Sequence, residues 1–243
     1  MPGSDNSEGS VRINRYIASC GICSRRAADK LIEEGRININ GRTAVMGDTV
    51  GPDDTVTYDN EVITPAKKEI YIMLNKPRGI TCTASPDDPD NIIDYLGYPE
   101  RLFTIGRLDK ESTGLILLTN DGITANKLLR AEGRHEKEYI VAVDKPVTEE
   151  FLLKMSSSIF LPELGKFTIP SEVMPNGERS FKIILTQGLN RQIRRMCEEL
   201  GYHVVRLKRV RFANIVLGQL EAGQSRELTD IEIIRLKEIA DHH

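Results

Sequence analysis

The chain has 243 residues, of which 40% are hydrophobic and 28% are charged, a composition typical of a globular protein. No run approaches the roughly 18 consecutive apolar residues that a transmembrane helix needs, so we expect no membrane partner and a cytoplasmic location. The polar, acidic N-terminus lacks the basic start and apolar core of a secretory signal. We expect residues 1–10 to form a disordered leader.

The net charge is −3, from 33 basic and 36 acidic residues, and this balance argues against a protein that binds nucleic acid over its whole surface. The basic residues are nevertheless clustered in residues 11–47 and 186–211. Basic surfaces on an acidic body and an evenly mixed surface both fit this distribution. Cys20 and Cys23 have no second pair at zinc-site spacing, so we expect no metal site.

The N-terminal residues predict a compact unit of two helices and a hairpin. Ser24 can cap the second helix, which Gly35 ends, and Asn40-Gly41 is typical of a tight turn between strands. These elements are expected over residues 11–19, 24–35, 37–39, 42–45 and 55–58. We expect the unit to span residues 11–63, with a linker over residues 64–69.

The rest of the chain predicts a larger domain over residues 70–243. Apolar runs and alternating patterns predict strands near 70–74, 115–118, 137–143, 181–186 and 202–207. Helices are expected near 125–129, after Thr148, over 190–200 and over 230–240, where Thr229 is the cap. Short connections favour antiparallel pairing. The predicted fold class is α+β: a small α/β unit, then a mainly antiparallel mixed sheet flanked by helices.

One loop carries a candidate reactive group. The chain has no Walker A loop, no Rossmann glycine fingerprint, no zinc-protease motif and no nucleophile elbow. Gly106-Arg-Leu-Asp109, however, forms a turn between apolar strands, where a carboxylate is held rigidly and stays accessible. A neighbouring arginine would keep Asp109 ionised as a nucleophile. The alternative is an aspartate that caps its own turn.

A second candidate is the basic helix within residues 187–200. Helical spacing places Ile193, Met196, Cys197 and Leu200 on one face. It places Arg191, Arg194 and Arg195 on the opposite face. This arrangement fits either a surface helix with arginine–glutamate pairs or a cationic face for phosphates. Tyr139, on a predicted strand, is a third candidate, since its ring can stack on a base or pack in the core.

Four elements in this order resemble the ribosomal small-subunit-type family of pseudouridine synthases. They are Asn75-Lys-Pro77, Gly106-Arg-Leu-Asp109 through Leu118-Thr-Asn-Asp-Gly122, Lys137-Glu-Tyr139, and Asn190-Arg-Gln-Ile-Arg-Arg-Met196 followed by Val204 to Arg209. Residues 11–57 resemble the ribosomal-protein-S4-type RNA-binding domain that precedes the catalytic domain in this family. Each element alone is weak evidence for the resemblance, and their combination in this order is strong evidence.

The resemblance implies roles for individual residues. Asp109 would be the nucleophile, Arg194 would pair with it, and Tyr139 would stack on the target uracil and take part in proton removal. Arg107 would help fill the space that the flipped nucleotide leaves, and Leu207 would pack under the uracil. The implied reaction breaks the N1–C1′ bond of uridine, rotates the base and rejoins it through C5, without metal or cofactor. Attack on C6 of the base and on C1′ of the ribose both stay open.

The implied partner is RNA, bound by a monomer. Further substrate contacts are expected from Asn190, Arg191, Gln192, Arg195 and Arg209. In the N-terminal domain, RNA contacts are expected from Arg12, Arg15, Arg25, Arg26 and Arg36. The run from His135 to Pro146 and Gly188-Leu-Asn-Arg-Gln192 are most similar to a branch that acts on 23S rRNA, with a tRNA anticodon stem-loop as a second target. The sequence departs from that branch in lacking a long basic C-terminal tail.

Two other functions fit parts of the sequence. A non-catalytic RNA-binding or ribosome-assembly factor would use the small domain and the Arg191–Arg195 face, but it needs no anion at the centre of a basic site. A hydrolase could use Asp109 as a nucleophile on phosphate. Asp109-Lys-Glu lacks the nearby second carboxylate that would hold magnesium, so the hydrolase ranks last.

Overall fold

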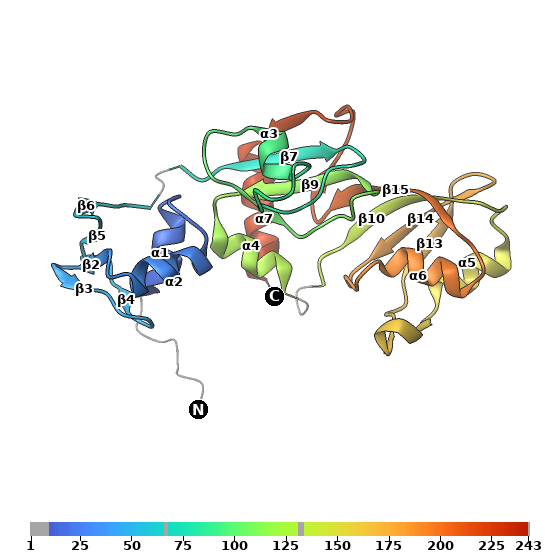
Figure 1. Ribbon diagram of the computed structural model, residues 1–243. Coiled ribbons are helices and arrows are strands. Elements are labelled where there is room, and N and C mark those ends of the chain that lie inside the picture. The colour runs from blue at the N-terminus through green and yellow to red at the C-terminus, as the bar shows by residue number, and fades with distance from the viewer. Residues whose placement is uncertain (1–9, 66–67, 131–133, 243) are drawn as a thin grey trace. The chain divides into compact units, whose positions relative to one another are not determined.

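The computed structural model describes residues 10–65, 68–130 and 134–242, and Figure 1 shows its helices and strands. The chain divides into two compact units, one of residues 1–69 with 99–101, the other of residues 70–98 with 102–243. All but the last residue of the expected leader lie outside the described residues, as do residues 66–67 of the expected linker.

The N-terminal unit packs two helices against short strands. The helices are α1 (Ile13–Ser19) and α2 (Arg25–Glu33). The strands are β1 (Val11–Arg12), β2 (Ile37–Ile39), β3 (Arg42–Thr43), β4 (Thr49–Val50), β5 (Val56–Tyr58) and β6 (Glu61–Val62). They pair as β3-β2-β5-β6 and β1-β4. The helix expected from residue 11 begins only at Ile13, because Val11 pairs with Val50 as a strand.

Local signals explain these elements. The Ser24 hydroxyl accepts a hydrogen bond from the amide of Ala27 at 3.2 Å and caps α2, as predicted. Asn40 and Gly41 both have positive φ, 51° and 81°, which is the backbone that a two-residue hairpin requires. The apolar faces of α1 and α2 then meet the strands in one core, formed by Ile13, Ile17, Ala28, Ile32, Ile37, Ile39, Ala44, Val50 and Val56.

The larger unit is built on one mixed sheet. Its strands are β7 (Tyr71–Lys76), β8 (Phe103–Ile105), β9 (Thr113–Thr119), β10 (Lys137–Val143), β13 (Glu172–Pro175), β14 (Ser180–Leu185), β15 (Val204–Phe212), β16 (Ile215–Val216) and β17 (Ser225–Glu227). A separate hairpin joins β11 (Phe160–Leu161) to β12 (Lys166–Phe167). The helices are α3 (Ile92–Leu96), α4 (Gly122–Leu129), α5 (Glu149–Ser156), α6 (Gln192–Glu199) and α7 (Asp230–Asp241).

The strand order is β13-β14-β10-β15-β9-β7-β17. Pairs along this order are antiparallel except β9 with β15, which run parallel. The predicted α+β class with a mainly antiparallel mixed sheet is therefore confirmed. Every residue of β7 is buried, as is every residue of β9 except the first. Because consecutive strand residues point to opposite faces, these two strands are covered on both sides.

Two apolar cores cover the two faces of this sheet. Ile72 and Leu74 share one core with residues of α5 and α6, whereas Tyr71 and Met73 share the other with residues of α4 and α7. Figure 1 shows α4 and α7 at the β7–β9 half of the sheet and α5 and α6 at the β10–β14 half. None of the described helices is long and apolar enough to cross a bilayer.

Several element boundaries differ from those expected. Strand β10 spans residues 137–143 as predicted, and Thr148 and Thr229 cap α5 and α7 as predicted. Helix α6 begins at Gln192 rather than at residue 190, because Arg191 adopts a left-handed conformation. Strand β15 continues to Phe212, well past the expected end at residue 207. Helix α3 and the β11–β12 hairpin had no sequence prediction.

Candidate active site

The loop that carries Asp109 joins β8 to β9, and hydrogen bonds hold its backbone in place. The Leu108 side chain is buried, and its amide donates to the Cys82 sulfur at 3.4 Å. The Ser112 amide donates to the carbonyl oxygen of Asp109 at 3.0 Å and closes a turn. These contacts fix the backbone on both sides of Asp109, so its carboxylate projects from a rigid loop.

Lys76, at the end of β7, supports the same loop from the interior. Its side chain is fully buried, and Nζ donates to the carbonyl oxygens of Pro77 at 2.9 Å and of Lys110 at 3.3 Å. The amide of Gly79 donates to the same Lys110 oxygen at 2.9 Å. Burial lowers the pKa of Lys76. The carbonyl of Lys110, the residue after Asp109, is thus held by two donors from one neighbouring segment.

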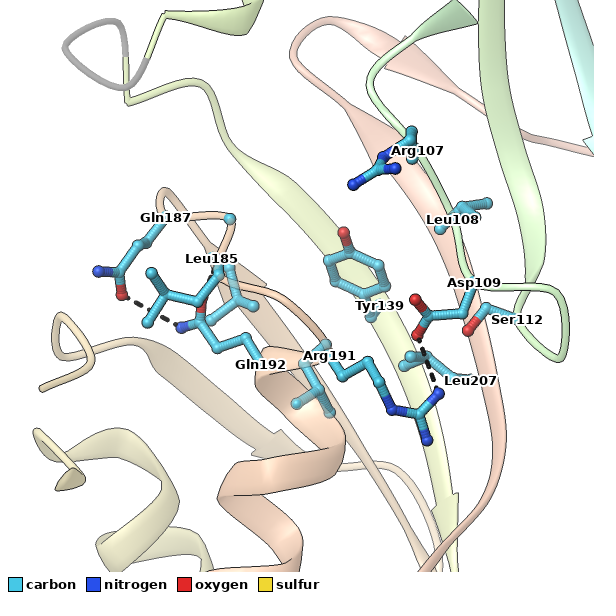
Figure 2. A pocket seen from close by; sticks show the side chains of 13 residues that line it. Arg107, Leu108, Asp109, Ser112, Tyr139, Leu185, Gln187, Arg191, Gln192 and Leu207 are labelled. Atoms are coloured by element: carbon cyan, nitrogen blue, oxygen red, sulfur yellow. Dashed lines mark hydrogen bonds and ion pairs between the residues drawn. The ribbon is translucent and has the colours of Figure 1, made fainter. Parts of the chain in front are cut away.

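A cavity of about 90 Å³ opens beside this loop, and Figure 2 shows the side chains around it. Its lining residues are Arg107, Leu108, Asp109, Ser112, Tyr139, Leu185, Gln187, Gly188, Leu189, Arg191, Gln192, Ile193 and Leu207. They come from the Asp109 loop, β10, β14 and the turn after it, α6, and β15. Segments far apart in sequence therefore meet at one concave site that contains both polar and apolar groups.

Two arginines approach the Asp109 carboxylate. Nε of Arg194 lies 3.7 Å from Oδ2 of Asp109, and Nη1 of Arg191 lies 3.9 Å from the same oxygen. Figure 2 marks the Arg191 contact with a dashed line. Both distances suit an ion pair but exceed a hydrogen bond. The carboxylate is partly exposed, so it is open to a ligand while it is paired.

The two arginines occupy different environments. The Arg194 side chain is only 10% exposed, whereas that of Arg191 is 41% exposed and also lies 3.5 Å from Oε2 of Glu111. Hydrogen bonding and the two arginines lower the pKa of Glu111, its own backbone amide being the largest cause. Arg194 is thus a buried counter-ion of Asp109, whereas Arg191 is an exposed side chain at the cavity rim.

Tyr139 and Leu207 form neighbouring parts of the cavity wall. Tyr139 lies on β10 and is only 9% exposed, and Leu207 lies on β15 opposite Val141. Figure 2 shows the Tyr139 ring beside Asp109. The Tyr139 ring packs in the apolar core, which was one of its two alternatives, and it also lines the cavity, while stacking on a base stays a prediction.

Gln192 lines the cavity and shapes the turn before α6. Its side chain is buried, its Oε1 accepts from the amide of Leu189 at 3.0 Å, and its Nε2 donates to Oε1 of Gln187 at 3.3 Å. The same Gln187 oxygen accepts from the amide of Ile169 at 3.0 Å. These bonds hold the wall opposite Asp109 in one conformation.

The structure does not bring Arg195, Asn190 or Arg209 to the cavity wall. Nε of Arg195 donates to the Asn190 carbonyl at 3.0 Å, and its guanidinium pairs with Glu163. Arg209 is 2% exposed, and its Nε donates to the Leu115 carbonyl at 2.6 Å. The geometry of Arg209 supports a role inside the sheet rather than the expected substrate contact.

Helical spacing placed Arg191, Arg194 and Arg195 together on the face opposite the apolar one, but only Arg191 is exposed in the structure. The buried guanidinium of Arg194 turns toward Asp109, and Arg195 is largely covered by its contacts with Asn190 and Glu163. The helical spacing treats each arginine as if it ended at the helix surface. In the fold, the Arg194 side chain instead lies buried against the Asp109 loop.

The candidate arginines of the N-terminal unit fall into two groups. Arg12, Arg25 and Arg26 are exposed and Arg15 is partly exposed, and none of them has an ion-pair partner among the described residues. Arg36 instead forms a two-pronged pair with Asp59 and lies over the Tyr58 ring, 4.8 Å from its centroid. The hydrogen bonds that Arg36 donates to Asp59 raise the pKa of Arg36, so the charge of Arg36 is already matched within the unit.

Some residues of the site had no prediction from sequence. Ser112, Glu111 and Gln187 are polar groups that contact Arg194, Arg191 and Gln192, respectively. Ser112 and Glu111 lie within three residues of Asp109, and that proximity was the available signal. Lys76 belongs to a quoted motif, but its buried support of the loop depends on the meeting of β7 with the loop after β8.

No group of metal-ligating side chains accompanies the site. Within the described ranges, no three His, Cys, Asp or Glu side chains are placed to hold a metal ion.

Cys20 and Cys23 are free and partly buried, and burial raises the pKa of Cys20 to about 11. Thiols with raised pKa values are poor nucleophiles at neutral pH.

Comparison with sequence families gives two matches. The model of the RNA pseudouridylate synthase family matches residues 70–199. The S4 domain model matches residues 11–56. The first match covers the Asp109 loop, Tyr139 and Arg194, and the second covers the N-terminal unit up to β5.

Individual relatives agree with these matches. The chain is 48% identical over 237 residues to the dual-specificity RNA pseudouridine synthase RluF of Escherichia coli strain K12, which covers 97% of this chain and 81% of that protein. It is 37% identical over 240 residues to the ribosomal large subunit pseudouridine synthase B of Bacillus subtilis strain 168, covering 95% of this chain and 97% of that protein.

A solved structure extends the similarity to the fold. A crystal structure of a pseudouridylate synthase superposes with a TM-score of 0.69 at 32% identity, covering 93% of this chain and 99% of that chain. The match includes both units, and the sequence resemblance to the pseudouridine synthases is therefore confirmed. The chain belongs to the RNA pseudouridine synthase family, as an isomerase whose catalytic domain follows an S4 domain.

Proposed function

We propose that Asp109 is the nucleophile of this isomerase and that Arg194 is its buried counter-ion. The observation that carries the proposal is the 3.7 Å approach of a largely buried guanidinium to a carboxylate that stays open to a cavity. An arginine cannot lose its proton in a protein, so it supports the anionic form of Asp109 throughout the reaction. The anion is the form that attacks.

The cavity has the groups that a flipped uridine requires. A uracil in a stack is out of reach of Asp109, so the nucleotide is extruded at a cost of a few kcal/mol. Stacking on the Tyr139 ring returns about 1–3 kcal/mol. Leu207 packs against the base from β15, and Arg107 at the rim is exposed and has no described ion-pair partner, so it can fill the vacated space in the RNA.

The reaction redistributes one proton and one bond. Attack by Asp109 on C6 of the base or C1′ of the ribose leads to cleavage of the N1–C1′ bond. The base turns, C5 bonds to C1′, the bond to Asp109 breaks and returns the free carboxylate, the C5 proton is removed and N1 gains a proton. Tyr139 lies on the cavity wall beside Asp109, so we assign its hydroxyl to the removal of the C5 proton.

We propose RNA of the large ribosomal subunit as the substrate, with tRNA as a second target. Support comes from the names of two relatives, one a large-subunit enzyme and one a dual-specificity RNA enzyme. Residues 11–63 would act as the RNA-binding domain, residues 64–69 as the linker and residues 70–243 as the catalytic domain. The exposed Arg12, Arg25 and Arg26 and the partly exposed Arg15 would contact phosphates and position the RNA without reading its sequence. The enzyme would act as a cytoplasmic monomer.

The test compares the wild type with Asp109→Asn on transcribed 23S rRNA, 16S rRNA and tRNA. Carbodiimide labelling with primer extension maps each new pseudouridine, and filter binding measures RNA affinity. We expect a stop in 23S rRNA with the wild type, no stop with Asp109→Asn, and similar affinity for both. Asp230→Asn, an exposed aspartate at the start of α7, is the matched control and keeps full turnover.

Three results would each contradict a part of the proposal. Full turnover by Asp109→Asn would remove Asp109 as the nucleophile. Stops only in 16S rRNA would retain the reaction and reject the large subunit as the substrate. Binding by the wild type without any stop, on intact rRNA and on rRNA from partly assembled subunits, would favour a binding factor.

A further inference from the structure

Ser112 ends the Asp109 loop at the point where β9 begins. It is 1% exposed, yet it lines the cavity. Its amide donates to the carbonyl of Asp109 at 3.0 Å, so its position is tied to the backbone of the proposed nucleophile. Figure 2 shows the Ser112 side chain next to that of Asp109.

The hydroxyl of Ser112 contacts the arginine that faces Asp109. Nη2 of Arg194 donates to Oγ of Ser112 at 3.3 Å, and Nη1 donates to the carbonyl of Val204 at 3.4 Å. The guanidinium is planar, so two contacts at its far end fix its orientation. Its third group, Nε, is buried without a hydrogen-bond partner among the described residues and lies 3.7 Å from Asp109.

We propose that Ser112 is a positioning residue, whose hydroxyl holds the Arg194 guanidinium with Nε turned toward Asp109. The inference rests on the proposed roles of Asp109 and Arg194. It adds a group that acts through the arginine rather than on the reacting atoms. Ser112 and Asp109 lie on one turn, so the same backbone sets both the carboxylate and the orientation of its counter-ion.

A competing carboxylate explains why orientation matters. Glu111 lies between Asp109 and Ser112 in sequence, and Arg191 and Arg194 both act on its charge. Glu111 is exposed and already pairs with Arg191 at 3.5 Å. Without the Ser112 hydroxyl, the Val204 carbonyl is the only remaining hydrogen-bond acceptor of the Arg194 guanidinium among the described residues, and the guanidinium is freer to turn from Asp109 toward Glu111. Less positive charge would then face Asp109.

The turn itself does not need the hydroxyl. The bond that closes it uses the Ser112 amide, which every substitution except proline retains. Ser112→Ala therefore removes the Arg194 contact and leaves the backbone hydrogen bond. A merely structural role would lower stability. A positioning role lowers turnover in a way that depends on Arg194.

The experiment measures kcat and KM on the RNA that the wild type modifies. Hydrogen bonds to charged groups correspond to about a 10- to 100-fold change in rate. We expect Ser112→Ala to lower kcat by that factor with KM within about twofold. Ser112→Thr retains the hydroxyl and should restore kcat. Ser112→Cys, with a weaker acceptor, should give an intermediate value. Ser171→Ala, which removes a partly buried hydroxyl bonded to the Met155 carbonyl, is the control and keeps wild-type kcat.

A double-mutant cycle separates positioning from structure. In the Arg194→Lys background, the guanidinium donor is gone, so Ser112→Ala should cause no further loss of kcat. Additive losses, or wild-type kcat for Ser112→Ala, would overturn the proposal. Loss of turnover in Asp109→Asn together with wild-type kcat in Ser112→Ala rejects only the role of Ser112. Turnover by Asp109→Asn rejects the proposed nucleophile instead.

Discussion

The backbone of Gly114 passes against the backbone of Arg209 so closely that a Cβ on Gly114 would lie 2.2 Å from the Arg209 carbonyl oxygen and 2.7 Å from its nitrogen. These residues are opposite each other in the parallel pair of β9 and β15. Strand β9 follows the Asp109 loop, and β15 carries Leu207. The close approach therefore sets the separation of two sides of the active site.

Gly114→Ala should destabilise the protein severely. Its backbone has φ of +101°, which a side chain disfavours, and the atoms that an added Cβ meets belong to backbone that cannot move aside cheaply. We expect a loss of more than about 3 kcal/mol in the free energy of unfolding. Urea denaturation followed by circular dichroism measures it.

Gly122→Ala is the control for this substitution. Gly122 begins α4, has no positive φ, and an added Cβ there would lie 3.6 Å from the Phe103 ring, an ordinary contact. We expect wild-type stability or a gain of about 0.5–1 kcal/mol, since alanine favours helix. Equal stability of the two variants would show that β9 and β15 adjust without strain.

Much of the fold could be predicted from local patterns. Strand β10 shows strict alternation, and Asn40-Gly41 carries the chemistry of its turn. Helix α3 is only five residues long, and the strands of the β11–β12 hairpin are two residues each. Elements this short give no measurable period. Tertiary packing decides them.

The candidate site was predicted unevenly for a similar reason. The resemblance pointed to Asp109, Tyr139, Arg194 and Leu207, and the structure brings these four side chains together at one site. Helical spacing placed Arg194 at the surface, since it contains no information about the loop that receives the side chain. Arg209 lies beyond the predicted end of its strand at residue 207, and its buried contact with the Leu115 carbonyl depends on the pairing of β15 with β9, which the sequence pattern does not show.

Lys137 should make stability depend on pH in the alkaline range. Burial, with repulsion from Arg209, lowers the pKa of Lys137 to about 8 from its ordinary 10.5. Between these values the unfolded chain binds more protons than the native protein, so the free energy of unfolding rises with pH. This contribution is lost as the pH falls through about 8, where the native ammonium is charged in a partly buried site.

The measurement is the melting temperature of wild type and Lys137→Met from pH 7 to pH 10. Methionine keeps an unbranched apolar chain but cannot ionise. We expect the melting temperature of the wild type to rise relative to that of the variant as the pH rises through about 8, with most of the change above that value. A constant difference across the range would show that Lys137 has an ordinary pKa.

Exposed arginines of the N-terminal unit should control the salt dependence of RNA binding. Arg25 and Arg26 begin α2 and have no ion-pair partner in the described part of the unit, whereas Arg36 is paired with Asp59. Each phosphate contact adds about 0.7–0.9 to the slope of log affinity against log salt. We expect Arg25→Ala and Arg26→Ala each to reduce the slope by up to that amount.

Arg36→Ala is the matched control in this series, since it removes the same charge from a pair already neutralised by Asp59. Its slope should stay near that of the wild type. A larger reduction for Arg36→Ala than for Arg25→Ala would mean that RNA displaces Asp59. The contacts of this unit would then differ from those proposed.

Arg191 allows the effect of its backbone to be separated from that of its guanidinium. Its φ of 51° lies in the left-handed region, where a side chain costs about 1–2 kcal/mol relative to glycine. Arg191→Gly removes the guanidinium and the strain, and Arg191→Ala removes only the guanidinium. We expect Arg191→Gly to unfold at a higher urea concentration than Arg191→Ala.

The kinetic outcome should be the same for both variants, because each loses the only part of Arg191 that reaches Asp109 and the cavity rim. We expect an equal fall in kcat/KM, of about tenfold or more for a lost charged contact, measured on the RNA that the wild type modifies. Full activity in Arg191→Gly with loss in Arg191→Ala would assign the function to the turn rather than to the guanidinium. Equal loss with unequal stability shows instead that the protein tolerates strain at residue 191 in order to hold a positive charge 3.9 Å from its nucleophile.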